Sequence, residues 1–230
     1  MTRSTVRDTP RSVTALPPAS VAGAVSAVAV LGLFAVVVAL RWESHFANVD
    51  DYLYALQTRE YRDALGADPR DLLHAWRMFG SNSPLIPMLA LPVAAVSASP
   101  HALILVQVLP LVLLLGSTRS LLRALGITPS ASWFTAAAIA TLPPVMGYAA
   151  MYHFGLAAAA CATLAAAAYA RSERLAHLRP ALLLGLAVGL LALTRVVAPV
   201  YVAALCVPLV VDVLASGPSS ATMPSLTPAD

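Results

Sequence analysis

Residues 21–40 read VAGAVSAVAVLGLFAVVVAL, and no charged side chain occurs anywhere between residues 12 and 40. About 20 apolar residues let a helix cross a hydrocarbon core of ~30 Å. A cleaved signal peptide is the competing interpretation, but its apolar region is only about 7–15 residues long. The run here is longer and is followed directly by Arg41. It therefore predicts a signal-anchor helix, with residues 1–19 as a disordered cytoplasmic lead-in.

The composition of the whole chain indicates a polytopic membrane protein with an all-α fold. Of the 230 residues, 59% are hydrophobic and only 11% are charged, whereas charged residues make up about 25% of an ordinary soluble domain. The net charge of +3 comes from arginine, since the chain contains no lysine. Arginines of membrane proteins concentrate in short cytoplasmic loops, and no basic stripe with interleaved aromatic residues is present. We therefore expect a lipid bilayer, and no nucleic acid, as a partner.

The arginines also decide between two topologies. If residues 84–98 crossed the membrane, all five arginines between residues 119 and 179 would lie outside, against the positive-inside rule. Prolines interrupt this short segment, so we predict a juxtamembrane or re-entrant helix within an outer loop over residues 41–101. The result is a multi-pass helical bundle in the plasma (inner) membrane with a cytoplasmic N-terminus. The tail, residues 215–230, is predicted to be disordered. The six predicted spans are residues 20–40, 102–118, 130–146, 154–170, 180–194 and 197–213.

Asp50 and Asp51 follow the first predicted span closely, at the predicted outer membrane surface. A carboxylate pair there can deprotonate an acceptor hydroxyl or amine, with one acid as general base and its neighbour holding a hydrogen bond or a divalent metal. The alternative is that the pair only caps a helix from Tyr52 onward, where acids at the N-terminus are stabilising. The two roles can coexist. No cofactor is required by the sequence, and a divalent metal stays an open alternative.

Two further polar positions lie at predicted outer ends of helices. Arg195 interrupts the last apolar run, and an arginine at membrane depth usually faces protein or water on a functional path. Its planar fork of donors suits a lipid-linked phosphate, and the alternative is an arginine that snorkels to lipid headgroups. His153, between Tyr152 and Phe154, could be a ligand or a proton carrier, or an interfacial hydrogen-bonding residue. The residues alone leave both positions open.

Three segments follow one another in a recognisable order. They are the acidic pair with Tyr and Ala in residues 50–55, the proline-led apolar segment in residues 83–89, and the pattern Gly-x-x-x-Gly-Leu-x-x-Leu-Thr-Arg in residues 185–195. In this order they resemble the polyprenyl-phosphate-dependent glycosyltransferases of the GT-C fold, such as protein O-mannosyltransferases and the transferases that add aminoarabinose to lipid A. The resemblance covers residues 20–212.

The resemblance implies a module that transfers a sugar from a polyprenyl-phosphate donor to an acceptor on the outer membrane face. Asp50 carries over as the catalytic base, with Asp51 beside it, and Arg195 carries over as a residue that holds the donor phosphate. The candidate substrate-binding residues are Arg195, Tyr54, His153 and Tyr152.

Three departures from the family pattern matter. The outer turn before His153 lacks the second acid that family members often carry, and Ser83 stands where many have lysine. Such transferases also continue for several more spans, so residues 20–214 look like an N-terminal part that a second membrane chain completes. The alternatives are a truncated, inactive partner subunit and, less favoured, a small transporter. Transporters commonly place ionisable residues near the bilayer midplane, whereas nearly all charge here lies at predicted interfaces.

Overall fold

The computed structural model describes six segments of the chain and four isolated residues. They are residues 17–40, 49–68, 70–80, 82–97, 99–172 and 175–194, with residues 200, 207, 211 and 215. Every regular element in this part of the chain is a helix, which confirms the all-α fold class. In chain order the elements are α1 (Ala19–Leu40), α2 (Val49–Ala67), α3 (Asp71–Phe79), α4 (Leu85–Val96), α5 (Pro100–Ile104), η1 (Leu105–Gln107), α6 (Val108–Ala124), α7 (Pro129–Ala140), α8 (Pro143–Ala149), α9 (Gly155–Arg171) and α10 (Leu178–Ala192).

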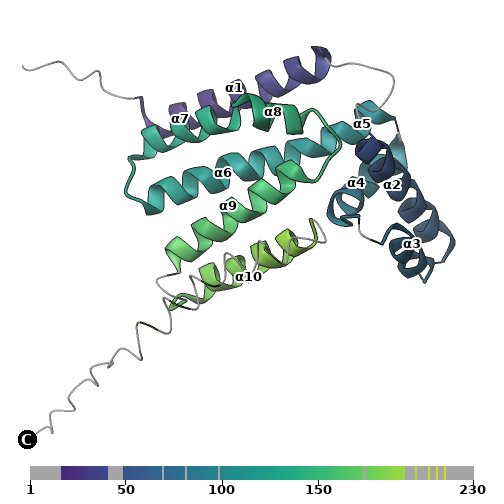
Figure 1. Cartoon of the computed structure of the whole chain (residues 1–230). Coiled ribbons are helices and arrows are strands. Elements are labelled where there is room, and N and C mark those ends of the chain that lie inside the picture. The colour runs from purple at the N-terminus through teal and green to yellow at the C-terminus, as the bar shows by residue number, and fades with distance from the viewer. Residues whose placement is uncertain are drawn as a thin grey trace, which may run out of the picture.

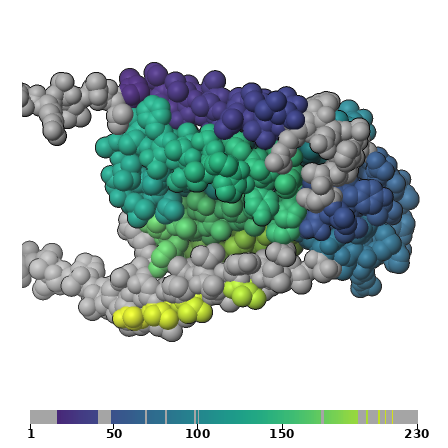
Figure 2. Space-filling view, turned by 45° about the horizontal axis from the view of Figure 1, so that its top comes forward, coloured from purple at the N-terminus to yellow at the C-terminus, as the bar shows by residue number. Residues whose placement is uncertain are grey.

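The helices form a layer with a lobe at one end of it (Figure 1). Across the layer the order is α1, α7, α6, α9 and α10, and each of these helices packs against the next. After a two-residue interruption of the helix, α8 follows α7 and leads towards the lobe. The lobe contains α2, α3, α4 and α5, with α2 packed against both α3 and α4. Figure 2 shows the lobe joined to the end of the layer, with α1 along the layer's edge.

Aliphatic and small side chains hold the layer together. Phe34 of α1, Leu111 of α6 and Ala136 of α7 belong to one buried cluster that extends to α9. Between α9 and α10 the cluster is built largely from alanines, including Ala165 and Ala187. Small residues let helix backbones approach closely, so the alanine-rich α9 packs between α6 and α10.

The outward faces of the layer are apolar as well. Val28 of α1, Leu109 of α6 and Leu182 of α10 are all more than half exposed. An extended apolar surface of this kind marks contact with a membrane or another protein. Two helical runs, Ala19–Leu40 and His101–Ala124, are long and apolar enough to cross a membrane. They coincide with the first two predicted spans.

The structure corrects the third predicted span, residues 130–146. α7 ends at Ala140, and α8 begins anew at Pro143. Proline lacks a backbone N–H and disfavours helical geometry in the residue before it, and Leu142 accordingly has φ −57° and ψ 141°. The segments of the fourth and fifth predicted spans form α9 and α10, apolar helices of 17 and 15 residues that are shorter than the two runs able to cross a membrane. Most of the sixth predicted span, residues 197–213, lies outside the described residues.

The lobe occupies most of the predicted outer loop. α2 buries Tyr54, Thr58 and Tyr61, while its Arg59 and Asp63 are exposed. α4 is the short helix predicted within residues 84–98, and its 12 residues rise only ~18 Å. That is well short of a ~30 Å hydrocarbon core. The beginning of the predicted loop lies outside the described residues.

At the end of the layer away from the lobe, α6 and α9 end and α10 begins (Figure 1), and each of these helix ends carries an arginine. Arg119 lies near the end of α6, Arg171 ends α9, and Arg179 lies in the first turn of α10. The start of α1 is at this end too, because the Ser130 hydroxyl in the first turn of α7 donates a hydrogen bond to the Pro17 carbonyl at 2.6 Å. The arginines of the layer and the acidic pair of α2 are therefore separated along the helix axes.

Candidate active site

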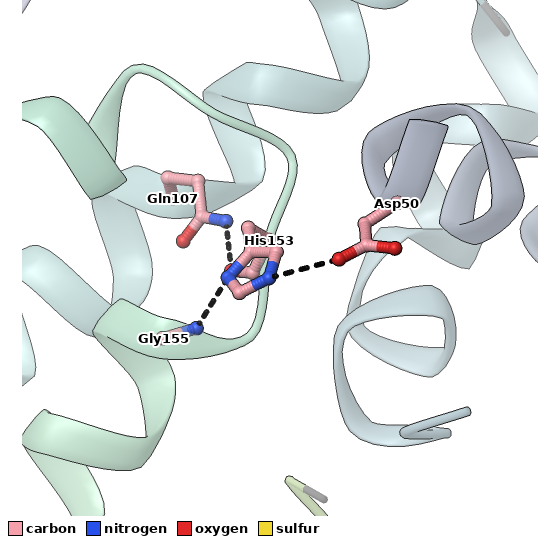
Figure 3. A network of polar contacts seen from close by, with 4 residues as sticks. All are labelled: Asp50, Gln107, His153 and Gly155. Carbon is pink, nitrogen blue, oxygen red and sulfur yellow. Dashed lines mark hydrogen bonds and ion pairs between the residues drawn. The ribbon is translucent and has the colours of Figure 1, made fainter. Parts of the chain in front are cut away.

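Asp50 and His153 come together where the lobe joins the layer (Figure 3). Asp50 lies in the first turn of α2, and His153 lies in the turn between α8 and α9. Asp50 Oδ2 is 3.9 Å from His153 Nε2, and the two side chains are 67% and 13% exposed respectively. The carboxylate is therefore open to solvent, whereas the imidazole is largely enclosed and directs one nitrogen towards it. Two residues that the sequence indicated separately form one pair.

Hydrogen bonds to the backbone fix the imidazole and its turn. The Gly155 N–H donates to His153 Nδ1 at 3.1 Å, so in the neutral imidazole the proton is on Nε2, facing Asp50. Gln107 is fully buried in η1, and its amide nitrogen donates to the carbonyls of Met151 at 2.9 Å and of His153 at 2.6 Å. The turn that carries the histidine is thereby anchored to the start of the long helical run through α6 (Figure 3).

Three aromatic rings surround the imidazole. The Tyr148 ring stacks on it, with centroids 5.6 Å apart and planes at 29°, and the Phe154 centroid lies at 4.1 Å. Tyr54 of α2 meets it edge-on at 6.0 Å. Gly155 makes room for the stack, because an added Cβ would lie 3.0 Å from the Tyr148 ring and 3.3 Å from His153 Nδ1. The ring contacts and the glycine together hold the imidazole in one orientation.

Tyr152 joins this turn to α2. It is fully buried, and its hydroxyl lies 2.7 Å from Thr58 Oγ1. The Thr58 hydroxyl itself donates to the Tyr54 carbonyl at 2.7 Å, so the Tyr152 hydroxyl is the donor to Thr58. Burial raises the pKa of Tyr152 above its ordinary range, which keeps the phenol protonated. Tyr152 therefore has a supporting role. Its buried hydroxyl contacts Thr58 and does not face the side of the imidazole that a ligand could reach.

The two acids of the predicted pair have different surroundings. Asp51 is only 1% exposed, whereas Asp50 reaches out towards His153. Both lie in the first turn of α2, where a carboxylate interacts favourably with the helix dipole. The helix-terminal and catalytic interpretations are therefore compatible. Within the described residues, no group of three Asp, Glu, His or Cys side chains is placed to hold a metal ion.

A hollow of about 360 Å³ opens beside the histidine. Its volume falls in the range of small-ligand sites, about 300–1,000 Å³. α8 and the turn after it form the hollow, so a bound molecule would contact the imidazole of His153, whose Nε2 lies 3.9 Å from Asp50. The lining residues are Pro144, Gly147, Tyr148, Met151 and His153.

The other two segments that carry the family resemblance meet at the same junction. Ser83, just before α4, is buried and donates a hydrogen bond to the Leu193 carbonyl at the end of α10, at 2.8 Å. Tyr54 of α2 and Ile86 of α4 share a buried cluster against which Leu190 of α10 packs. Segments that are far apart in the sequence are thus neighbours in space.

An apolar groove of about 330 Å³ lies next to the contact between Ser83 and Leu193. Aliphatic and aromatic side chains form nearly all of its lining, which consists of Tyr61, Leu72, Leu73, Trp76, Pro84, Met88 and Leu193. Arg195, which the resemblance assigns to the donor phosphate, lies outside the described residues.

Two residues that build the site were not predicted. Gln107 is the only polar side chain in the apolar run of residues 102–115, and an isolated polar residue in such a run signals a specific partner. That signal was available in the sequence. The role of Gly155 could not be predicted from the sequence, because it depends on how the Tyr148 ring packs against His153.

No protein-family model, curated protein or solved structure matches this chain. Its function is therefore inferred from the geometry of the junction and from the residues that form it.

Proposed function

We propose that this chain is a membrane glycosyltransferase module that moves a sugar from a polyprenyl-phosphate donor to an acceptor hydroxyl or amine. The observation that carries the proposal is the Asp50–His153 pair, 3.9 Å apart, beside a hollow of ligand size. An exposed carboxylate next to an oriented imidazole is suited to general-base catalysis. The pair lies at the end of the layer opposite the arginines, in keeping with chemistry on the outer membrane face.

In the proposed reaction Asp50 takes the proton of the acceptor. The acceptor oxygen or nitrogen attacks the anomeric carbon of the sugar, the bond from this carbon to the donor's phosphate oxygen breaks, and the electron pair leaves with the phosphate. His153 presents Nε2–H to one carboxylate oxygen, which leaves the other oxygen for the acceptor. Their separation exceeds a hydrogen bond, and such catalytic contacts commonly tighten when the substrate binds.

The distribution of charge supports the membrane part of the proposal. Short-loop arginines concentrate on the cytoplasmic side, and Arg119, Arg171 and Arg179 lie at the end away from Asp50. We therefore assign that end to the cytoplasm and the lobe to the outside of the plasma membrane. The apolar outward faces of the layer then contact lipid, and a second membrane chain supplies the helices that complete the enzyme.

The apolar groove suits the polyprenyl chain of the donor. Its lining includes Trp76 and Leu72 from α3 and Met88 from α4, which offer hydrocarbon and aromatic surface without charge. Leu193 also lines it, and Arg195 follows two residues later in the sequence. On this proposal the groove takes the isoprenoid chain and Arg195 holds the phosphate.

Donor binding is tested first, on the full chain in proteoliposomes. The probe is a short-chain polyprenyl phosphate carrying a radiolabelled sugar. Because Trp76 lines the groove, binding should change its fluorescence emission, and Trp76→Phe should remove that change. Unlabelled polyprenyl phosphate should compete, whereas the free sugar should not. Absence of donor binding to the wild type would overturn the lipid-linked reaction.

Transfer is tested next, in an assembly that is active with the wild-type chain. Asp50→Asn should lower transfer by about 10²- to 10⁴-fold with donor binding unchanged. Asp63→Asn, which removes an exposed acid of the same helix that pairs with Arg62, is the matched control and should transfer normally. Undiminished transfer by Asp50→Asn would reduce Asp50 to a helix-terminal acid. Donor binding without transfer in every assembly would favour the inactive partner subunit.

A further inference from the structure

We infer that a second hollow, at the arginine end of the layer, binds the headgroup of an anionic phospholipid. This hollow has a volume of about 190 Å³ and lies between α6, α9 and α10. Its polar lining consists of Ser120, Arg171 and Arg179, one from each of the three helices. Its apolar lining consists of Leu164, Ala167, Ala168, Pro180 and Leu183.

The two arginines are available to an anion. Arg171 and Arg179 are both exposed, and neither forms an ion pair with the part of the chain that the structure describes. Glu173, which lies between them in the sequence, is outside the described residues. Guanidinium forks bind phosphate oxygens in a bidentate manner, and the Ser120 hydroxyl adds a donor from the third helix.

The turn between α9 and α10 sets the relative position of the two arginines. The Ser172 hydroxyl, fully buried, donates to the Tyr169 carbonyl at 2.8 Å and accepts from the Leu175 N–H at 3.1 Å. The His177 N–H donates to the Ser172 carbonyl at 3.2 Å. Leu175 has φ 70°, a left-handed conformation that is uncommon outside glycine and costs energy. These bonds join the end of α9 to the start of α10, from which Arg171 and Arg179 both line one hollow.

The apolar lining points to a lipid as the source of the phosphate. Leu164 and Leu183 lie beside the arginines, and the exposed Leu182 and Leu186 continue the apolar face along α10. A phospholipid combines a phosphate with acyl chains that would follow this face. Basic pockets between transmembrane helices on the cytoplasmic side are typical headgroup sites. The inference depends on the layer lying in a membrane and is independent of sugar transfer.

Native mass spectrometry of the full chain tests this inference. The purified protein is equilibrated in detergent with equimolar phosphatidylglycerol and phosphatidylcholine, and the retained lipids are measured. The wild type should prefer phosphatidylglycerol. Arg171→Gln combined with Arg179→Gln should lower that preference on the order of tenfold. Arg59→Gln combined with Arg123→Gln changes the net charge equally outside the hollow and should leave the preference intact.

Three results would overturn the inference. The first is an unchanged lipid preference in the Arg171/Arg179 glutamine variant, and the second is an equal loss in the Arg59/Arg123 variant, which would show an effect of net charge alone. The third is displacement of phosphatidylglycerol by inorganic phosphate, which would identify a site for the free anion. If the glutamine variant unfolds, the double variant Arg171→Lys with Arg179→Lys replaces it in the test. This variant keeps both positive charges but loses the bidentate donors of the guanidinium groups. It should retain an intermediate preference, and wild-type preference would contradict the guanidinium contacts.

Discussion

The Ser83 hydroxyl donates a hydrogen bond to the Leu193 carbonyl oxygen at 2.8 Å, which fastens the start of α4 to the end of α10. The last carbonyls of a helix have no partner within the helix, so the serine satisfies a group that α10 leaves unpaired. The bond joins the lobe to the layer next to the apolar groove. The shape of the groove should therefore depend on a single hydroxyl.

Ser83→Ala should lower the free energy of unfolding by about 1–3 kcal/mol, because it leaves the Leu193 carbonyl without its donor. It should also shift the emission of Trp76, which shares the groove lining with Leu193. Thermal unfolding in detergent and fluorescence measure the two effects. Ser130→Ala breaks a similar bond, to the Pro17 carbonyl, at the other end of the layer, and should leave the emission unchanged. Identical spectra for wild type and Ser83→Ala would contradict the coupling.

Gly155→Ala should disturb the stack of Tyr148 on His153, since the new Cβ meets the tyrosine ring at 3.0 Å. A displacement of about 1 Å at a reacting group can cost on the order of 10²-fold in rate. We expect a loss of that size in sugar transfer with donor binding retained. Gly185→Ala is the matched control, because an added Cβ there meets nothing within 4 Å. Equal transfer by the two variants would show that the stack does not position His153.

Tyr152→Phe should destabilise the protein by about 1 kcal/mol near neutral pH, through loss of the hydrogen bond to Thr58. Burial raises the pKa of Tyr152, so the contribution of the neutral phenol is fully present below its ordinary pKa of about 10. That contribution is lost as pH rises from there towards the folded-state pKa. The stability difference between wild type and Tyr152→Phe should therefore narrow above about pH 10. A difference that widens with pH would contradict the assignment.

Membrane orientation is tested by placing single cysteines in the lobe and at the far end of the layer. Tyr52 of α2 and Leu125 after α6 are both exposed, and the native Cys161 and Cys206 are replaced by alanine as background. An impermeant thiol reagent added outside intact cells should label Tyr52→Cys, and should label Leu125→Cys only after permeabilisation. Labelling of Leu125→Cys from the outside would reverse the proposed orientation.

Local sequence rules account for much of the architecture. The helical class follows from the apolar runs, and the two longest helical runs lie where uncharged segments predicted them. The break before Pro143 also had a local signal, the pair Pro143–Pro144. The length of the apolar run nevertheless led to the prediction of one continuous span. Proline geometry outweighed hydropathy there.

The candidate site was predictable only in its parts. Asp50 and His153 each stood out in the sequence, yet their meeting depends on how α2 packs against the turn after α8, through Tyr152 and Thr58. The anchoring of that turn by Gln107 is equally a matter of tertiary contact. No spacing along the chain encodes such a distance, because it arises from packing between segments that the sequence separates widely.

Three helices of the layer, α7, α9 and α10, are short for a bilayer. At 1.5 Å per residue, α7 rises ~18 Å, α10 ~22 Å and α9 ~26 Å, against a hydrocarbon core of ~30 Å. Hydrophobic mismatch of this sign is relieved partly by local thinning of the lipid around the protein. In a membrane, we expect the outer surface to dip towards His153. On the proposed function, this dip would let the phosphate of the donor approach Asp50 while the isoprenoid tail stays in the hydrocarbon core.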